Sequence, residues 1–501
     1  MSTTQISTDR PTVETTTGPV QGIWRGGSAA FYGIPFAEAP VGEHRFAAPV
    51  PRRPWDGVLD ASAPGATPQR RPFGEVTTIP EPSFPGDSTL NVNVFTPAPG
   101  RPDANLPVLV WIHGGGFFAG SPSSPWYDGR SFNRDGVVTV SLSYRLGFDG
   151  FGWIADGPLN RGLLDQLAGL AWVQQNIAAF GGDPNRVTIA GQSAGGSSVM
   201  ALLASPAAKG LFSRVISHSG ANLAMTAQRA EKIGRDFAAG LGVEPTRAGW
   251  SQLSEDAILD AQAALTSMDE PPPASASAFV ANVLAGRALN LAFVPAVGDE
   301  VLPFGVLEAL QRGIGAEVDL LAGTVAHEFT MMTMGAREAW AGSDAVQSLA
   351  DGGIAPEAAT TYVAGHPELT STADVCGQLI TDFSFRIPTL TWADARPSTT
   401  WLYDFRWPTP LLGQSVHCLE LPFAWDLLDA DGVTQVTGPN PPVRLAHDMH
   451  EAWVRFIADG DPGWATWNGA NAQVFGADAA DTYRPEQVLA ASLLTGHRPA
   501  L

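Results

Sequence analysis

A serine between two glycines is the clearest sign of chemistry in this sequence. Ser193 lies in Gly191-Gln-Ser-Ala-Gly195, directly after the short apolar run Val187–Ala190. A serine at a sharp strand-to-helix turn can act as a nucleophile, and the strained backbone there needs small flanking residues. The pattern alone is weak in a chain with 54 glycines. The hypothesis of a nucleophilic Ser193 therefore depends on what surrounds it.

A glycine-rich loop upstream supplies a second element of the same chemistry. The apolar run Leu106–Ile112 predicts a buried strand that leads into His113-Gly-Gly-Gly116. Acyl transfer forms a tetrahedral intermediate with a negative oxygen, and backbone N–H groups can bind that oxygen where no side chain obstructs them. We therefore predict an oxyanion hole made by Gly115, Gly116 and Ala194. A plain turn is the alternative for this loop taken by itself.

Further motifs run along nearly the whole chain. They are Phe31–Gly42, Pro54–Val58, Asn91–Pro97, Ser143–Gly147, Asn160–Gln166, Phe180–Pro184 and Met449–Phe456. In this order they resemble the type-B carboxylesterase family, whose members include bacterial para-nitrobenzyl esterases and the cholinesterases. The resemblance implies an α/β-hydrolase fold and a serine esterase that needs no cofactor and acts on a small-molecule ester.

The resemblance also implies an acid for the catalytic triad. A serine needs a base, and the base needs an acid to orient it, in the chain order serine, acid, histidine. Glu328 matches the family's acid, although His327 and Phe329 differ from the usual flanking residues. A surface glutamate is the alternative for Glu328. Asp299 and Glu300 are the competing acids.

Five of the nine histidines follow Glu328 and are candidates for the base: His366, His417, His447, His450 and His497. His417 is favoured because Ser415–Phe423 resembles the family's catalytic-histidine loop, with Glu420 at the matching acidic position. His447 and His450 are three residues apart, which is not the i, i+4 spacing of a zinc-binding helix. We therefore predict no metal.

Residues beside these motifs indicate the kind of substrate. Phe117 and Phe118 follow the oxyanion glycines, so we expect their rings to line the pocket. Gln192 stands where many family members have a glutamate, and Ser219 matches a family serine near the triad. Residues 72–90 lack the tryptophan with which cholinesterases bind choline. The prediction is hydrolysis of small uncharged apolar or aryl esters.

Two other functions stay open at this point. A carbamate or aryl-amide hydrolase would use the same acyl-enzyme chemistry, and the sequence does not separate it from an esterase. A non-catalytic adhesion-type relative of the fold is disfavoured, because such proteins typically lose a triad residue and this chain has all three.

The elements that must position these residues alternate between strands and helices, which predicts an α/β fold with a mainly parallel sheet. We expect one catalytic domain over residues 1–501, in which residues 221–294 form a helical cap over the site. Residues 68–86, rich in proline, predict a mobile rim. The expected strands are Val108–Ile112, Val137–Tyr144, Val187–Ala190, Arg214–Ser217, Val318–Ala322 and Trp401–Phe405, and the main expected helix is Leu163–Ala179.

Composition limits the partners. A net charge of −21 disfavours nucleic acid and anionic membranes, because both repel an acidic surface. No segment reaches the ~20 apolar residues of a membrane span. The only cysteines, Cys376 and Cys418, fit a reducing compartment, so we expect a cytoplasmic protein. Cys418 follows His417, and we expect it to pack as an apolar side chain, with a reactive thiol as the alternative. Nothing indicates the oligomeric state.

Overall fold

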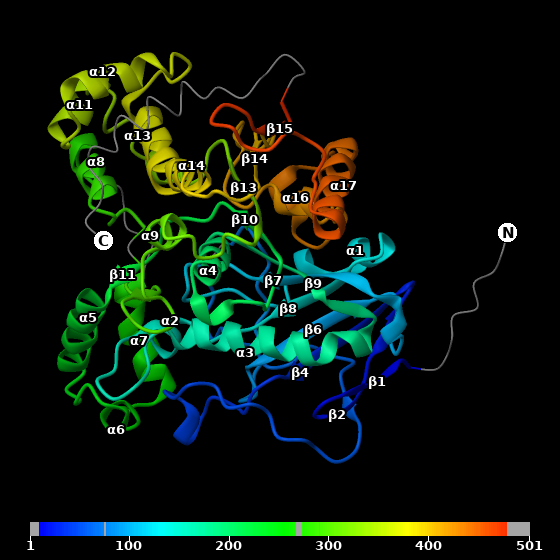
Figure 1. Cartoon of the computed structure of the whole chain (residues 1–501). Coiled ribbons are helices and arrows are strands. Elements are labelled where there is room, and N and C mark those ends of the chain that lie inside the picture. The colour runs from blue at the N-terminus through cyan, green and yellow to red at the C-terminus, as the bar shows by residue number, and fades with distance from the viewer. Residues whose placement is uncertain (1–9, 75–76, 267–272, 290, 478–501) are drawn as a thin grey trace.

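A mainly parallel sheet forms the centre of the computed structural model, which describes residues 10–74, 77–266, 273–289 and 291–477 (Figure 1). Ten strands of these described ranges make up the sheet, and only the pairs β3–β4, β4–β6 and β6–β8 are antiparallel. In spatial order they are β15 (Gln473–Phe475), β14 (Thr400–Phe405), β13 (Asp319–Val325), β10 (Arg214–His218), β9 (Gly182–Gln192), β7 (Leu106–Ile112), β8 (Val138–Leu142), β6 (Asn91–Thr96), β4 (Ser28–Pro35) and β3 (Ile23–Arg25).

Both faces of the sheet are covered by helices because its strands are apolar on both sides. In β7, Val108 and Val110 contribute to one core, and Leu109 and Trp111 contribute to the other. The first core also contains side chains of α3 (Arg161–Asn176), α4 (Ala194–Leu203), α9 (Val306–Gln311) and α14 (Ile387–Asp394). The second contains those of α1 (Arg130–Arg134), α15 (Leu421–Ala424), α16 (Val433–Thr437) and α17 (Val443–Asp459). The predicted class of fold is therefore confirmed, and each predicted strand overlaps an observed one.

Helices outside the sheet gather in two places (Figure 1). In one, α5 (Ala227–Gly240), α6 (Arg247–Trp250) and α7 (Glu255–Thr266) pack on the first core. In the other, α8 (Ala276–Leu284) joins α11 (Ala345–Asp351), α12 (Pro356–Ala364) and α13 (Thr372–Thr381) around a third core. The sequence patterns did not predict the helices between residues 331 and 394. The expected cap of residues 221–294 is helical, but its helices divide between these two groups.

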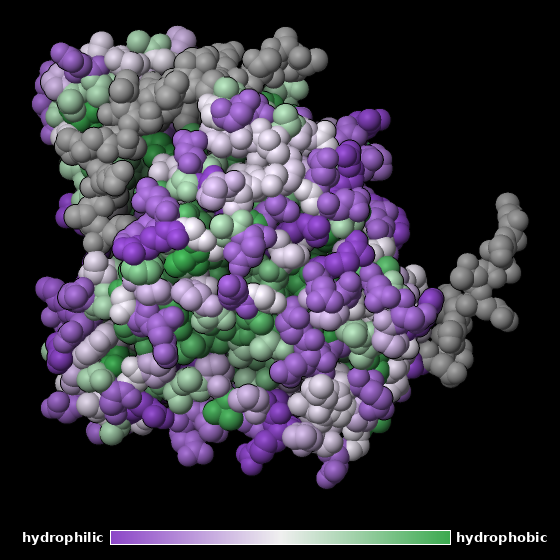
Figure 2. Space-filling view, in the orientation of Figure 1, coloured by the Kyte–Doolittle hydropathy of each residue, from purple (hydrophilic) through white to green (hydrophobic). Residues whose placement is uncertain are grey.

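Smaller elements complete the described residues. A three-stranded sheet contains β1 (Thr12–Thr15), β2 (Gly18–Gln21) and β5 (Leu59–Asp60), and a two-stranded one contains β11 (Met225–Thr226) and β12 (Ala296–Val297). Two further short α-helices are α2 (Gly147–Phe151) and α10 (Met331–Met334). Hydrophilic residues cover much of the face seen in Figure 2, with apolar residues scattered among them. Within the ranges given above, no helix has both the length and the apolarity to cross a membrane.

Candidate active site

Ser193 occupies the sharp turn between β9 and α4. Its backbone has φ 58° and ψ −122°, a conformation that side chains other than glycine rarely adopt. The neighbouring glycines are required by close packing: a Cβ on Gly195 would lie 2.0 Å from the carbonyl oxygen of Ile112, and one on Gly191 would lie 2.4 Å from Gly195. This turn lifts Ser193 to the carboxyl end of the sheet, as the sequence predicted.

The oxyanion loop lies directly against this turn. A Cβ on Gly114 would be 3.2 Å from Cβ of Ser193. Gly115 and Gly116 have φ of 101° and 60°, in the left-handed region that glycine adopts without strain. Within the described ranges, no acceptor bonds the N–H groups of Gly115, Gly116 or Ala194. Three unpaired N–H donors therefore lie beside the serine, where they can bind a negative oxygen.

His113 stabilises this loop from beneath. Burial lowers the pKa of His113 to about 4, so its imidazole is neutral at pH 7. Its Nδ1 lies 2.8 Å from the carbonyl oxygen of Gly114, to which it donates, and Tyr144 stacks on the ring with centroids 4.7 Å apart. The hydroxyl of Tyr144 donates to the carbonyl of His113 over 2.9 Å.

Glu328 and His417 are brought together in a buried pair. Nδ1 of His417 lies 2.5 Å from Oε2 of Glu328, and the other carboxylate oxygen accepts the N–H of Val325 over 3.0 Å. Glu328 is fully buried and His417 is 7% exposed. Because the carboxylate accepts from Nδ1, the lone pair of the neutral ring stands on Nε2, where a base needs it.

The loops that carry this pair are joined by backbone bonds. His327 pairs with Val416 in parallel fashion, and its N–H donates to the carbonyl of Ser415 over 2.9 Å. In return, the N–H of Ser415 donates to Nδ1 of His327 over 3.2 Å. Burial lowers the pKa of His327 to about 4, which keeps that nitrogen an acceptor. His327, a departure from the family pattern, thus helps to position the acid–base pair.

His417 has a second polar neighbour. The side-chain amide nitrogen of Gln192 lies 3.1 Å from its Nε2. In the described part of the chain no hydrogen bond joins Ser193 Oγ to His417. The structure therefore joins Glu328 to His417 and places Ser193 next in sequence to Gln192, which contacts His417. Burial lowers the pKa of His417, but the carboxylate of Glu328 opposes burial, and the pKa stands well above 6.5.

Comparisons with known proteins identify the family of the chain. The model of the Carboxylesterase family matches residues 9–482. The chain belongs to the carboxylesterase family. It is 35% identical to a para-nitrobenzyl esterase of Bacillus subtilis, with 90% of both chains covered, and 33% identical to a phenmedipham hydrolase of Pseudarthrobacter oxydans, with 96% of this chain and 98% of the other covered.

Solved structures give the same result for this carboxylesterase. A carboxylesterase of Geobacillus stearothermophilus superimposes with a TM-score of 0.78 at 32% identity, over 93% of this chain and 96% of the other. A PNB esterase superimposes with a TM-score of 0.75 at 31% identity, over 92% and 94%. The predicted α/β-hydrolase fold and the predicted resemblance are confirmed, and the protein is a hydrolase of carboxylic esters.

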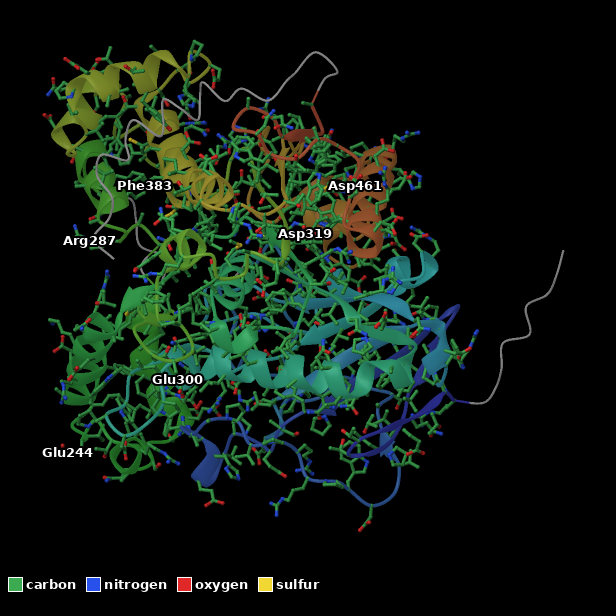
Figure 3. The ribbon with its side chains drawn as sticks, in the orientation of Figure 1. Glu244, Arg287, Glu300, Asp319, Phe383 and Asp461 are labelled. Carbon is green, nitrogen blue, oxygen red and sulfur yellow. The ribbon has the colours of Figure 1, made fainter. Side chains whose placement is uncertain are left out.

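The competing acids and the other candidate histidines of the carboxylesterase are exposed, have other hydrogen-bond partners or lie outside the described residues. Asp299 accepts from Asn160 and from two backbone N–H groups of its own loop, and Glu300 is exposed and lies away from β13 and β14 (Figure 3). His450 lies 2.9 Å from the carbonyl of Ala424 and 3.1 Å from Asp135. The other three are His447, which is exposed, His366, which is buried against Tyr362, and His497, which lies outside the described residues.

The two phenylalanines after the oxyanion loop differ in position. Phe117 has no exposed surface and packs on Phe151 with centroids 4.8 Å apart, so the expectation that its ring lines the pocket is wrong. Its φ of 66° turns the side chain into the core. Phe118 instead stacks on Phe73 and approaches Gly116, where a Cβ would lie 2.8 Å from its ring.

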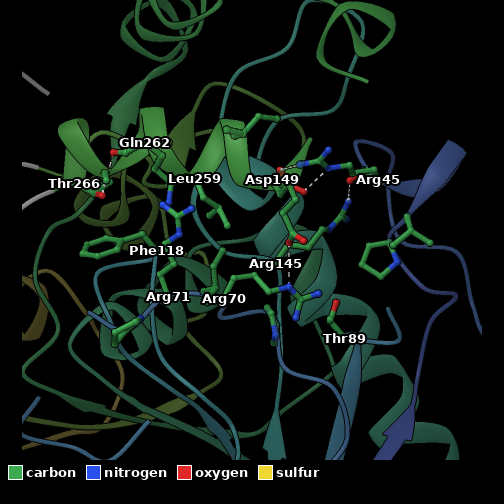
Figure 4. A pocket seen from close by; sticks show the side chains of 18 of the residues that line it. Arg45, Arg70, Arg71, Thr89, Phe118, Arg145, Asp149, Leu259, Gln262 and Thr266 are labelled. Carbon is green, nitrogen blue, oxygen red and sulfur yellow. Dashed lines mark hydrogen bonds and ion pairs between the residues drawn. The ribbon is translucent and has the colours of Figure 1, made fainter. Parts of the chain in front are cut away.

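Phe118 also borders a cavity of about 510 Å³ (Figure 4). This size suits a small organic molecule. Arginines line the cavity, but they pair with carboxylates: Arg45 with Asp149 over 2.9 Å and Arg70 with Glu255 over 3.1 Å. The pairing neutralises much of the charge around the opening. The expected rim of residues 68–86 contributes to this lining, and its predicted mobility stays a prediction.

Ser219 and Glu420 are buried, and among the described residues no hydrogen bond or ion pair joins either side chain to Ser193, His417 or Glu328. The hydroxyl of Ser219 and both carboxylate oxygens of Glu420 have no hydrogen-bond partner there. Oε1 of Glu420 lies 3.6 Å from Nδ1 of His218, whose other nitrogen accepts the N–H of Trp453 over 3.0 Å.

Two further aromatic residues, Phe329 and Phe385, contact His417, and the sequence analysis did not predict that they belong to the site.

Within the described ranges no three His, Cys, Asp or Glu side chains form a group that could hold a metal ion. Cys418 is buried beside His417 in the second core, and burial raises the pKa of its thiol. The thiol therefore stays protonated and packs as an apolar side chain.

Proposed function

We propose that Ser193, His417 and Glu328 are the catalytic triad of this carboxylesterase. Ser193 attacks the acyl carbon, His417 takes its proton through Nε2 and returns it to the leaving alcohol, and Glu328 orients the imidazole. Gly115, Gly116 and Ala194 bind the oxyanion. Water then releases the acid by the same steps in reverse. The observation that carries this proposal is the buried Glu328–His417 pair beside the strained Ser193.

We further propose that the preferred substrates are small, uncharged apolar or aryl esters. Gln192 adds no charge beside the nucleophile, and the arginines around the neighbouring cavity pair with carboxylates. Phe118 and Phe73 give that cavity an aromatic wall. Helices α7 and α8 belong to the segment proposed as a cap over the site, and Gln262 of α7 lines the cavity.

Hydrolysis of carbamates is a second candidate, favoured by one observation. The relative named phenmedipham hydrolase is similar along almost its whole length. A carbamate can acylate the same serine, although its acyl-enzyme is hydrolysed more slowly than that of an ester.

Two unpaired, buried cysteines favour the cytoplasm as the place of action.

A labelling experiment tests the triad. A fluorophosphonate should react with a single residue, which peptide mass spectrometry should identify as Ser193. Ser193→Ala should fold normally and lose about 10⁴-fold or more in kcat on p-nitrophenyl acetate. A label on another residue, or a variant that keeps a tenth of the wild-type rate, would contradict the assignment.

A further inference from the structure

A π-helical turn stands close to the proposed base. Asp382–Arg386 joins α13 to α14 as a π-helix, a rare form that often marks functional positions. A local cause is Pro388, which has no N–H to donate and whose ring would collide with the carbonyl of Ser384 in an α-helix. A wider turn before the proline relieves this collision.

Buried hydrogen bonds stabilise this turn. The carboxylate of Asp382, 1% exposed, accepts from the hydroxyl of Tyr362 over 2.8 Å and from the amide of Gln378 over 2.9 Å. Nη1 of Arg386 donates to the same carboxylate over 2.8 Å. A conformation supported by a buried charged group is a fixed part of the fold, and what it positions is therefore informative.

The turn positions Phe385 against the catalytic machinery. The ring of Phe385 is 1% exposed and lies 5.3 Å from the imidazole of His417, between centroids. It also stacks on Phe329, with centroids 5.5 Å apart and planes 14° from parallel. Phe329 lies 4.6 Å from the same imidazole and is only partly buried. The two rings therefore form one aromatic wall beside His417, and Phe329 is its accessible part.

Chemistry decides which part of the substrate meets this wall. In ester hydrolysis the imidazole gives its proton to the leaving oxygen, so the leaving group must lie within hydrogen-bond distance of Nε2. Side chains that flank the imidazole are consequently neighbours of the leaving group, whereas Phe118 lies beside Gly116 at the oxyanion. Aromatic rings favour offset or edge contacts with another ring over contacts with a saturated one.

We infer that Phe329, supported by Phe385, determines the leaving-group preference of the enzyme and selects esters of aromatic alcohols. This inference rests on the proposed triad, because it uses His417 as the proton donor to the leaving oxygen. It assigns a role to Phe329, which stands at one of the positions where the chain departs from the family pattern.

Two esters of equal acyl group test the inference. Benzyl acetate and cyclohexylmethyl acetate differ only in whether the ring of the alcohol is aromatic, and both give the same acetyl-enzyme. Phe329→Leu should lower the benzyl-to-cyclohexylmethyl ratio of kcat/KM by about two- to tenfold, the range expected for a lost aromatic contact. Phe329→Tyr, which keeps the ring, should retain the wild-type ratio. Equal losses on both esters in Phe329→Leu would overturn the inference.

A matched control and a measurement on the wild type complete the test. Phe383 belongs to the same π-helical turn (Figure 3), and none of the ring contacts within the described ranges joins it to His417. Phe383→Leu should therefore leave the ratio unchanged. In the wild-type enzyme, benzyl alcohol should inhibit more strongly than cyclohexylmethanol, and equal inhibition would overturn the inference without any variant. A wild type labelled away from Ser193 would instead overturn the proposed triad.

Discussion

The side-chain amide of Gln192 lies 3.1 Å from Nε2 of His417, on the opposite side of the imidazole from Glu328. An amide N–H that donates there occupies the lone pair that, in the proposed mechanism, receives the proton of Ser193. The base therefore has a partner on each ring nitrogen before substrate binds, and Gln192 must share or release Nε2 during catalysis. Both contacts influence the pH at which the enzyme works.

When the pH is lowered, the wild-type enzyme should lose activity at a higher pH than an enzyme whose base has the ordinary pKa of a histidine. The carboxylate of Glu328 raises the pKa of His417 above 6.5 against the effect of burial, and only the neutral imidazole can act as base. When the pH is lowered, the imidazole of His417 therefore becomes protonated at a higher pH than an unperturbed histidine does. The acid limb of kcat/KM for an uncharged ester should have its midpoint above 6.5. A midpoint at or below that value would contradict the raised pKa.

Gln192→Glu should move this acid limb further upward. A carboxylate beside Nε2 stabilises the imidazolium, which raises the pKa of His417 and reduces the neutral fraction at a given pH. The comparison needs an uncharged substrate, so that the new charge acts on the base and not on the ester. An acid limb that coincides with that of the wild type would show that residue 192 does not contact His417 in solution.

His417→Ala and His450→Ala should have different consequences. Loss of the base should reduce kcat by about 10⁴-fold or more while the protein stays folded. Loss of His450 removes its bond to Ala424 and its contact with Asp135, which should cost about 1–3 kcal/mol of unfolding free energy. Activity per folded molecule should remain in that variant. Urea denaturation and steady-state kinetics on both variants separate the two effects, and the reverse pattern would assign the base to α17.

Phenyl butyrate should be hydrolysed at least about tenfold faster than butyrylcholine in kcat/KM, a difference of ~1.4 kcal/mol in transition-state binding. Gln192 is neutral, and residues 72–90 contain no tryptophan to hold a quaternary ammonium group. The two esters share an acyl group and can compete in one reaction. Preference for the choline ester would reveal a cation site elsewhere in the pocket.

The sequence predicted those parts of the fold and site that depend on local pattern. Strand β7 and helix α3 have the apolar periodicity that their burial requires. Ser193 stands in a motif whose glycines are needed because a Cβ on either one would lie only 2.0 Å or 2.4 Å from a backbone atom. Strand β9 was predicted too short. It begins at Gly182, before Asp183-Pro-Asn185, because Leu106 pairs with Gly182 ahead of a register shift.

Features that arise from distant segments could not be read from the sequence. Phe117 follows the oxyanion glycines, but its φ of 66° directs the ring into the core, and no pattern in the chain reports that angle. Phe385 reaches His417 only because of the π-helical turn. The hydroxyl of Thr381 accepts the N–H of Glu328 over 3.1 Å, a contact between residues 53 positions apart. His327 and Phe329 did have a signal in the sequence, namely their departure from the family pattern.

The close packing of glycines around Ser193 makes an inactive form of the enzyme useful as a substrate trap. Gly191, Gly195 and the backbone of Ile112 pack closely around residue 193, whose φ is 58°, and within the described ranges no hydrogen bond involves its hydroxyl. Alanine at this position keeps the turn, the three oxyanion donors and the Glu328–His417 pair. Crystals of that variant soaked with an intact ester would show acyl and alcohol parts in their places before any bond is broken.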